Sequence, residues 1–358
     1  MRILQVCPNS YQNGIGGVSD HVMNIAERLA KGHDVTVFAT NPNGRLAWRE
    51  VVNGVKVQRF RCFAPGESYY LSADMLANLR RAKFDVVHGH NYHAFPMHFS
   101  SFAKCKKFVV TAHFHGAGSS VFRNCLFKVF KPIGKRTLCK ADKIVAVSEF
   151  EKHLLCEQFA IDPSRVVVVP NGVDFMEYID LKPRRHDFKS ILYVGRLQTY
   201  KGVQYLIETL PTLDANVRLE IVGKGFLKDF LKKRAKELKV DNRVLFFQDL
   251  SRKELLQKYA DADAFVLLSR HEAYSIAVAE ALVAGTPCIV ANASALTEWI
   301  DNESCFGVNY PIDISELSNL INSVLEGNIK RRGMKKWMRT KIVDWNDVSA
   351  RLEKIYES

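Results

Sequence analysis

The chain has 358 residues, of which 47% are hydrophobic and 25% are charged. This is the composition of a folded globular protein, and it excludes disorder as the state of the whole chain. The formal net charge of +13 leans toward the N-terminal half, where we expect any anionic partner to bind. No apolar run approaches the roughly 20 residues that cross a bilayer. We therefore expect a cytoplasmic protein, which leaves open peripheral contact with the inner face of a membrane.

The first half of the chain alternates short apolar runs with helical periodicity. The runs predicted as strands are Arg2–Val6, Asp34–Ala39, Val55–Phe60, Asp85–His88, Lys107–Thr111, Lys143–Val147 and Val166–Val169. Helical periodicity is clearest at Val18–Lys31 and Glu149–Glu157. Strands that are apolar on both faces and alternate with helices predict a parallel sheet covered by helices. Residues 1–169 are thus expected to form one Rossmann-like domain.

The pattern restarts after a segment rich in turn signals, which predicts an interdomain linker at residues 170–187. The strands predicted beyond it are Ile191–Val194, Arg218–Val222, Val244–Phe247, Ala264–Leu268 and Pro287–Val290, with helices between them at Lys228–Leu238 and Ser251–Tyr259. Residues 188–340 would form a second doubly wound domain, and 341–358 would end in an amphipathic helix. The fold class is therefore α/β, with two such domains facing across a cleft and ligands at the carboxyl ends of the strands.

The strongest functional signal is the segment His271–Glu280, which follows a predicted strand. Ser275 is the expected N-cap of a helix, and the free N–H groups of its first turn would bind an anion such as a diphosphate. Glu272 would lie in the loop and Glu280 on the second helical turn, each suited to gripping sugar hydroxyls. Apolar residues surround Glu280, so we expect it to be buried with a polar partner such as a ribose diol.

A second signal is Gly195-Arg196-Leu197 with Lys201-Gly202, in the loop after a neighbouring predicted strand. A single basic residue at the end of a strand would be interpreted as an ordinary solvent-exposed charge. Together, Arg196 and Lys201 can supply two cations to a diphosphate that lacks a metal.

A glycine-rich loop, Asn13–Val18, joins the first predicted strand to the first helix. Its glycines would let the backbone approach a ligand closely. The spacing is not G-x-G-x-x-G, and the second strand ends at Thr40-Asn41 without an acidic residue for a ribose. A nicotinamide cofactor is therefore not expected.

Histidines gather near the ends of two predicted strands, at His88, His90, His93, His113 and His115. A metal site is one interpretation, but their spacing matches no known zinc pattern. We favour a polar wall that contacts the sugar, and we expect no metal and no cofactor.

At these residues the sequence resembles the retaining family 4, or group 1, glycosyltransferases, which have the GT-B fold. The family pattern E-x7-E reads here as Glu272 to Glu280, and Ser275 and Ile276 replace its usual glycine and leucine. The resemblance also rests on Gly16-Gly17, the Arg196/Lys201 pair, Pro170-Asn171-Gly172-Val173-Asp174 and Val222-Gly223-Lys224-Gly225.

This resemblance implies a metal-independent, retaining hexosyltransferase that uses a UDP- or GDP-sugar and a glycan or lipid-linked acceptor in glycoconjugate or polysaccharide biosynthesis. The implied catalytic residues are His113, Glu272, Arg196 and Lys201. The implied donor-binding residues are Gly16, Gly17, Gly195, Arg196, Lys201, Gly223, Glu272, Tyr274, Ser275, Ile276 and Glu280. The N-terminal domain would bind the acceptor, and the last helix would cross back onto it. A nucleotide-sugar epimerase, a phosphorylase and a non-catalytic nucleotide-sugar-binding protein remain alternatives.

Residues Val121–Lys140 carry six basic and no acidic side chains, interleaved with apolar ones. One interpretation is an element that lies on an anionic membrane surface. The other is a solvated helix packed on the sheet and broken at Pro132-Ile133-Gly134. Nucleic acid is not an expected partner, because no recognition motif accompanies the charge.

Overall fold

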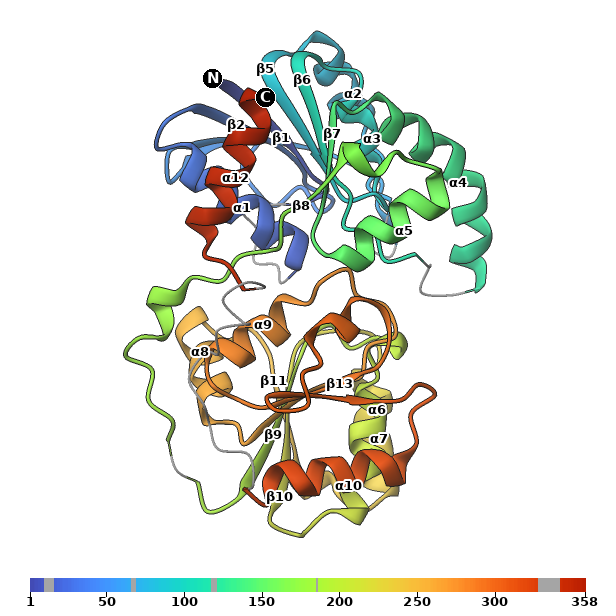
Figure 1. Ribbon diagram of the computed structural model, residues 1–358, viewed down its shortest axis with the longest axis vertical. Coiled ribbons are helices and arrows are strands. Elements are labelled where there is room, and N and C mark those ends of the chain that lie inside the picture. The colour runs from blue at the N-terminus through green and yellow to red at the C-terminus, as the bar shows by residue number, and fades with distance from the viewer. Residues whose placement is uncertain (10–15, 66–68, 117–120, 185, 328–341) are drawn as a thin grey trace. The chain divides into compact units, whose positions relative to one another are not determined.

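Figure 1 shows the computed structural model, which describes residues 1–9, 16–65, 69–116, 121–184, 186–327 and 342–358, with the backbone alone for 121–129. The chain divides into two compact units. Unit 1 comprises Met1–Gly172 and Val343–Ser358, and unit 2 comprises Val173–Ile342. The predicted linker 170–187 is therefore divided between the units, with most of it in unit 2.

Unit 1 is built on an eight-stranded sheet in the order β3-β4-β2-β1-β5-β6-β7-β8. Its strands are β1 (Arg2–Val6), β2 (Asp34–Thr40), β3 (Arg49–Val52), β4 (Val55–Phe60), β5 (Lys83–His90), β6 (Lys104–Thr111), β7 (Lys143–Ala146) and β8 (Val166–Val168). The pairs are parallel except β3 with β4. This edge strand is not indicated by the sequence, because its charged first half breaks any apolar run.

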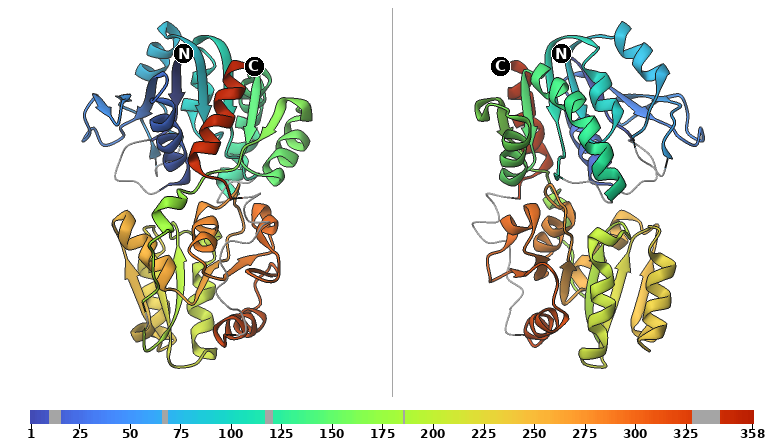
Figure 2. Two further views of the ribbon diagram at one scale, coloured as in Figure 1. Left: turned by 60° about the vertical axis from the view of Figure 1, so that its left-hand side comes forward. Right: turned by 90° about the vertical axis from the view of Figure 1, so that its right-hand side faces the viewer.

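The helices of unit 1 cover both faces of this sheet (Figure 2). They are α1 (Gly17–Leu29), α2 (Ala73–Arg81), α3 (Phe95–Ser100), α4 (Val121–Lys140), α5 (Glu149–Phe159) and α12 (Trp345–Glu357). α1 presents Val22, Ile25 and Leu29 to the core at helical spacing. The serines before α2 and α5 cap these helices, since each side-chain oxygen accepts from the backbone N–H of the third helical residue.

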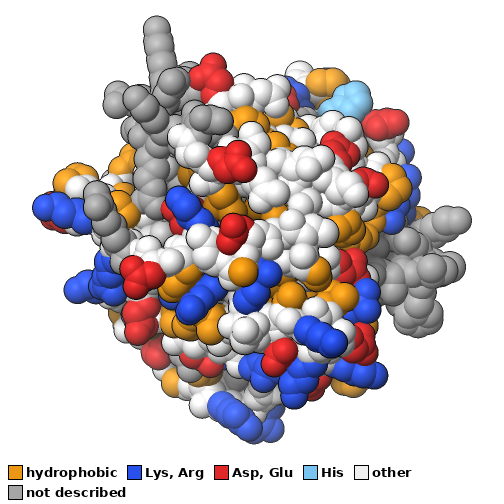
Figure 3. Space-filling view, turned by 90° about the horizontal axis from the view of Figure 1, so that it is seen from below, with side chains coloured by type: hydrophobic (Ala, Val, Ile, Leu, Met, Phe, Trp, Pro, Cys, Tyr) orange, Lys and Arg blue, Asp and Glu red, His pale blue; other side chains and the backbone are white. Residues whose placement is uncertain are grey.

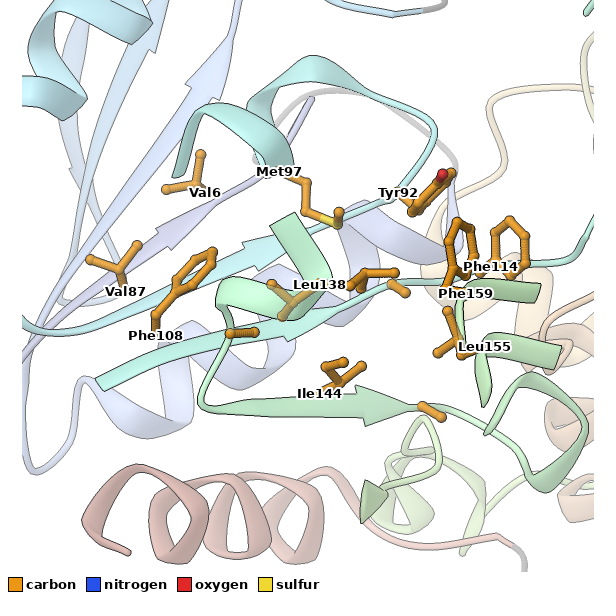
Figure 4. Packing of buried hydrophobic residues seen from close by; sticks show 14 of the residues in the cluster. Val6, Val87, Tyr92, Met97, Phe108, Phe114, Leu138, Ile144, Leu155 and Phe159 are labelled. Atoms are coloured by element: carbon orange, nitrogen blue, oxygen red, sulfur yellow. The ribbon is translucent and has the colours of Figure 1, made fainter. Parts of the chain in front are cut away.

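An aromatic-rich cluster fills the core beneath α3, α4 and α5 (Figure 4). Tyr92 lies at its centre, with its ring 4.9 Å from that of Phe114 and 5.2 Å from that of Phe159. Leu138 of α4 and Leu155 of α5 are fully buried in the same cluster. These rings fix the loops that follow β5 and β6.

The basic helix α4 is continuous from Val121 to Lys140, with Pro132 inside it. The predicted break at Pro132-Ile133-Gly134 is therefore wrong. A Cβ on Gly134 would lie 2.1 Å from the hydroxyl of Tyr92, so the helix passes directly against this core side chain. None of the helices in the described part of the chain has the length and apolar content that crossing a bilayer requires.

The last helix, α12, belongs to unit 1 and packs beside α1. Asp344 begins it, because its carboxylate accepts from the N–H of Asn346 at 2.7 Å. At its other end the hydroxyl of Tyr356 lies 3.2 Å from Gln5 Nε2 and 2.7 Å from His88 Nδ1. α12 is thus bonded to the two central strands, β1 and β5.

Unit 2 is built on a six-stranded parallel sheet in the order β11-β10-β9-β12-β13-β14. Its strands are β9 (Lys189–Val194), β10 (Val217–Val222), β11 (Val244–Phe247), β12 (Ala264–Leu267), β13 (Cys288–Ala291) and β14 (Cys305–Val308). Its helices are α6 (Val203–Thr209), α7 (Lys228–Glu237), α8 (Arg252–Asp261), α9 (Ile276–Val283) and α10 (Ile314–Leu325). Both units are therefore parallel sheets with helices, which confirms the predicted fold class.

The strand order reverses once in each unit, and this places the ligand-binding loops. In unit 1 the chain winds outward on one side of β1 through β2 and on the other through β5. In unit 2 it winds from β9 through β10 on one side and through β12 on the other. Loops leave the carboxyl ends of these neighbouring strands in opposite directions, which opens a site between them.

Candidate active site

Two glycine loops of unit 2 pack backbone against backbone at the carboxyl ends of β9 and β10. Gly195 N donates to Val222 O at 3.0 Å, and Leu197 N donates to Lys224 O at 2.8 Å. A Cβ on Gly223 would lie 1.9 Å from Gly195 O, so no side chain fits at this position. The structure thus brings the predicted donor-binding residues Gly195 and Gly223 into direct contact.

Lys201 and Glu272 form an ion pair that joins the β9 loop to the β12 loop. Both side chains are largely buried, with 14% and 12% of their surface exposed. The approach depends on Gly202, which has a φ of 75° and where a Cβ would lie 2.3 Å from Leu268 O. Glu272 is held from the other side, because its N–H donates to Ser294 Oγ at 3.0 Å. Two residues predicted to serve different parts of the donor are therefore in contact.

Arg196, in the same β9 loop, is exposed. Its Nη2 donates to the hydroxyl of Tyr200 at 2.8 Å, and its backbone oxygen accepts from the hydroxyl of Tyr193 at 2.9 Å. Among the residues that the structure describes, no carboxylate forms an ion pair with Arg196. Its charge, unlike that of Lys201, is left available for an anionic ligand.

The helix α9 begins directly after Tyr274 and Ser275. The Tyr274 side chain is buried, and its backbone oxygen accepts from Trp299 Nε1 at 2.8 Å. Ser275 occupies the N-cap position with a φ of 82° and makes no side-chain capping bond. The predicted position is right and the expected capping bond is wrong, because a capping serine needs an extended backbone. Ile276 is the first helical residue, so the unpaired N–H groups of this turn follow the Glu272 loop.

Glu280 is buried in α9 and forms an ion pair with Arg252 at the start of α8. Arg252 also contacts Glu177, with 2.7 Å between Nη2 and Oε2. Burial raises the pKa of Glu280, while the charge of Arg252 opposes this shift. Sequence reasoning missed Arg252 and Glu177, since neither stands in a motif. The polar partner expected for Glu280 is thus supplied here by an arginine.

The other predicted site residues lie in unit 1. Gly16 is the N-cap of α1 and Gly17 its first residue, whereas Asn13 to Ile15 lie outside the described residues. His113 follows β6, is buried, and has a φ of 49°, which is unusual for a residue with a side chain.

The grouped histidines of unit 1 have different surroundings. His88 is fully buried and has both ring nitrogens bonded, at 2.7 Å to Tyr356 and 2.7 Å to Thr111, so it braces the interior. The rings of His93 and His115 stack at 4.5 Å. Burial lowers the pKa of His88, His90 and His113 well below the usual value, so these rings are neutral at pH 7.

Comparison with known proteins gives the class to which this fold and site belong. In solved structures the chain resembles sucrose-phosphate synthase from Thermosynechococcus elongatus, with a TM-score of 0.81 and 18% identity over 99% of this chain and 98% of that one. It also resembles HepE from Anabaena in complex with UDP-glucose, with a TM-score of 0.79 and 16% identity over 100% and 99% of the two chains. The protein has the GT-B fold of glycosyltransferases.

Two sequence profiles cover most of the chain, Glycosyltransferase Family 4 at residues 15–176 and Glycosyl transferases group 1 at residues 176–341. The GDP-mannose:cellobiosyl-diphosphopolyprenol alpha-mannosyltransferase of Xanthomonas oryzae pv. oryzae is 30% identical over 80% of this chain and 77% of its own length. A glycogen synthase of Mycobacterium tuberculosis is 28% identical over 99% and 94%. The chain belongs to the family 4, group 1 glycosyltransferases, which confirms the resemblance seen in the sequence.

Proposed function

We propose that this glycosyltransferase moves a hexose from a UDP- or GDP-sugar to a glycan or lipid-linked acceptor with retention of anomeric configuration and without a metal. The observation that carries the proposal is the Lys201–Glu272 ion pair, which lies in the loops that precede α9 and follow β9. A phosphate-binding cation and a sugar-binding carboxylate are both present there, at the edge of the sheet where ligands bind.

The diphosphate of the donor would bind to Arg196, Lys201 and the first turn of α9. Arg196 has no carboxylate partner among the described residues and can turn toward the ligand. Lys201 is held by Glu272, so it is ordered before the donor arrives. Fixed cations and helix N–H groups stabilise the charge that develops on a leaving diphosphate, which is the task a metal performs elsewhere.

The two carboxylates would bind the sugars of the donor. Glu272 would accept hydrogen bonds from hydroxyls of the transferred hexose while it keeps contact with Lys201. Glu280 would accept from the ribose, and Arg252 would keep this buried carboxylate charged. His113 of unit 1 would contact the reacting sugar, as the family resemblance implies.

Retention follows from attack on the side that the diphosphate leaves. The bond between C1 of the sugar and the diphosphate oxygen breaks, and the electron pair goes to the diphosphate. The acceptor oxygen then bonds to C1 on the same face, and its proton passes to the departing phosphate oxygen. No obvious covalent nucleophile stands in the motifs, since Glu272 is paired with Lys201 and Glu280 with Arg252. This supports a route without a glycosyl-enzyme.

The comparisons support UDP- and GDP-sugars as the first donors to test. HepE was solved with UDP-glucose, and the Xanthomonas relative is named for GDP-mannose and a polyprenol-linked acceptor. A lipid-linked acceptor would require the enzyme to reach a membrane surface, for which α4 is the candidate element. Its Lys135 and Arg136 are exposed and lie beyond the packed Phe130, whereas Lys131 is half-buried with its Nζ over the ring of Phe159. On the face shown in Figure 3, by contrast, basic and acidic side chains are intermingled.

The test is a transfer assay in EDTA with UDP-, GDP- and ADP-sugars, each offered with free glycans and lipid-linked sugars. We expect release of one nucleoside diphosphate that depends on an acceptor, and an NMR coupling constant in the product that shows the anomeric configuration of the donor. Lys201→Ala and Glu272→Gln should lower the rate at least 100-fold. Lys233→Ala, which removes an exposed charge on α7, is the matched control and should leave the rate unchanged.

The competing functions give different results in the same assay. Conversion of the donor without an acceptor would identify an epimerase, and tight binding without turnover would identify a binding protein. Inversion of the anomeric centre, or activity that EDTA abolishes, would contradict the retaining, metal-free mechanism.

A further inference from the structure

Three histidines of unit 1 converge at the carboxyl edge of its central strands. His21 comes from α1, His90 ends β5 and His113 follows β6. One ring nitrogen from each lies within 4.8 Å of those of the other two. His21 and His90 are fully buried, and His113 is 9% exposed. The carboxyl ends of β5 and β6, neighbours in the sheet, bring the last two together.

Side-chain amides fix the orientation of two of these rings. His21 Nδ1 lies 2.8 Å from Asn171 Oδ1, and His90 Nε2 lies 2.7 Å from Gln5 Oε1. An amide oxygen only accepts, so in each pair the ring nitrogen carries the proton. The other nitrogen of a neutral ring then keeps its lone pair, which is the form that binds a metal. Gln5 is itself held, because its Nε2 donates to Tyr356.

The nitrogens on the other side of these rings lack hydrogen bonds. Within the described structure, His21 Nε2, His90 Nδ1 and His113 Nε2 are buried atoms without a hydrogen-bond partner. A buried polar atom that is left unpaired destabilises the folded protein. Three unpaired nitrogens on neighbouring rings point to a bound metal ion, which would accept a lone pair from each.

We propose that His21, His90 and His113 form a binding site for a divalent transition-metal ion of the zinc type, with Asn171 and Gln5 as positioning residues. Imidazole nitrogens suit such ions, and three histidine ligands with an open fourth position are a known arrangement. Zinc–nitrogen bonds of about 2.0–2.1 Å place the nitrogens about 3.3 Å apart, so binding draws together side chains whose nitrogens lie within 4.8 Å of one another without the ion. Among the described residues the cluster consists of these three histidines, which leaves the fourth position open to water or an anion.

All three histidines belong to unit 1, whereas Arg196, Lys201 and the first turn of α9, which are proposed to bind the donor diphosphate, belong to unit 2. The metal would tie α1 to the ends of β5 and β6, and Asn171 would connect it to the segment that leaves unit 1. The proposal shares His113 with the proposed mechanism and requires its Nε2 to bind the ion rather than the sugar. Metal binding is measured without donor or acceptor, so its failure leaves the proposed donor site of unit 2 unaffected.

The first test uses the full chain, purified without a histidine tag, stripped with a chelator and dialysed against zinc. We expect one equivalent of zinc with a dissociation constant of about 1 μM or tighter, measured by elemental analysis and competition with a zinc indicator. Cobalt should bind in its place and give the visible d–d absorption of a tetrahedral complex. Less than one equivalent, or a dissociation constant above about 100 μM, overturns the proposal on the wild-type protein alone.

Variants then locate the site. His21→Ala and His90→Ala should lose the bound equivalent, and Asn171→Ala should weaken binding about 10–100-fold through the orientation of His21. His153→Ala removes an exposed histidine of α5 and is the matched control, which should bind zinc as the wild type does. Circular dichroism identifies any variant that fails to fold. Full zinc binding by folded His21→Ala and His90→Ala would show that the ion sits elsewhere and contradict the proposal.

Discussion

At the scale of single residues, both carboxylates of unit 2 that are proposed to bind the donor are paired with basic side chains. Lys201 contacts Glu272, and Arg252 contacts Glu280. A buried charge without a partner destabilises the fold strongly, whereas a paired one can be kept ready for a ligand. Binding a diphosphate at Lys201 therefore adds a second anion to a cation that already has one. This arrangement explains why Lys201 is ordered without a ligand while Arg196 is exposed.

Ser275 offers a test of backbone strain at the start of α9. Its φ of 82° lies in the left-handed region, which costs a residue with a side chain about 1–2 kcal/mol relative to glycine. Ser275→Gly should therefore raise the free energy of unfolding of unit 2 by up to about 1 kcal/mol, since glycine loses more entropy on folding. Hydrogen exchange of unit 2, recorded over a range of urea concentrations, measures this change in the free energy of unfolding.

The matched control for Ser275→Gly is Ser251→Gly at the N-cap of α8. Ser251 has a φ of −62° and accepts a capping bond from Glu254, so its removal should lower stability by a few tenths of a kcal/mol. Equal effects of the two substitutions would contradict the strain assigned to Ser275.

The pairing between α8 and α9 can be tested in the same way. Arg252→Met leaves the Glu280 carboxylate buried without its cation and should lower the free energy of unfolding of unit 2 by about 2 kcal/mol. The loss is smaller than the 3–5 kcal/mol of a fully buried pair, because 42% of the Arg252 side chain is exposed. Adding Glu280→Gln should restore part of this stability. A double-mutant cycle in urea gives the coupling energy, and a value near zero would refute the role given to Arg252.

At the scale of elements, the apolar runs predicted the central strands of both sheets, since strands buried on both faces need continuous apolar sequence. The edge strands β3 and β14 were not predicted. Arg49-Glu50 opens the first, and the second holds Gly307 in its short span. The positions of Gly195, Lys201 and Glu272 in loops after strands could be predicted, because each follows an apolar run. The pairing of Arg252 with Glu280 could not be predicted. Ser251–Glu254 is typical of an ordinary first helical turn, and the contact of Arg252 with α9 depends on tertiary packing.

The buried histidines of unit 1 predict its response to acid. His98 Nε2 donates to Tyr92 O at 2.8 Å, and its Nδ1 lies 3.0 Å from Thr137 Oγ1. Burial lowers the pKa of His98 to about 4. A histidine in the unfolded chain titrates near pH 6.5. Between pH 6.5 and 4 the unfolded state therefore binds a proton that the folded state does not. The stability of unit 1 should fall as the pH decreases through this range, by about 1.4 kcal/mol per pH unit for each such histidine.

Hydrogen exchange of unit 1 at pH 7, 6 and 5 in EDTA measures this slope. His98→Gln should reduce the slope of unfolding free energy against pH by the contribution of one histidine, about 1.4 kcal/mol per pH unit. His153→Gln, at an exposed position, should leave the slope unchanged. A stability of unit 1 that is independent of pH between 7 and 5 would contradict the assignment.

At the scale of the whole molecule, unit 1 is built from two distant parts of the chain. α12 packs beside α1, and Tyr356 bonds to the central strands through Gln5 and His88. Trp345 packs against Gly172, where a Cβ would lie 2.6 Å from its ring. The path of the chain thus ties the segment before unit 2 to the segment after it.

Truncation after Val343 should therefore unfold unit 1 and leave unit 2 folded. The deletion exposes the apolar face of α1 and leaves the polar groups of Gln5 and His88 without Tyr356. Domains have a margin of only about 5–15 kcal/mol, so we expect the loss of a whole packed helix to unfold unit 1. Limited proteolysis should release a resistant fragment that corresponds to residues 173–342. Trp345→Ala, which keeps the helix, should weaken unit 1 without abolishing it, and a resistant N-terminal fragment in the truncated protein would contradict this account.

The central claim is that unit 2 binds a nucleoside diphosphate through Lys201, Arg196 and Glu280 without a metal. Calorimetric titration of the protein with UDP, GDP and ADP in EDTA tests it most directly. We predict that one of the three binds in the micromolar range, and that Lys201→Ala and Arg196→Ala each weaken its binding at least tenfold while Lys233→Ala does not. Absence of binding by all three nucleotides, or binding that neither Lys201→Ala nor Arg196→Ala weakens, would contradict this proposal.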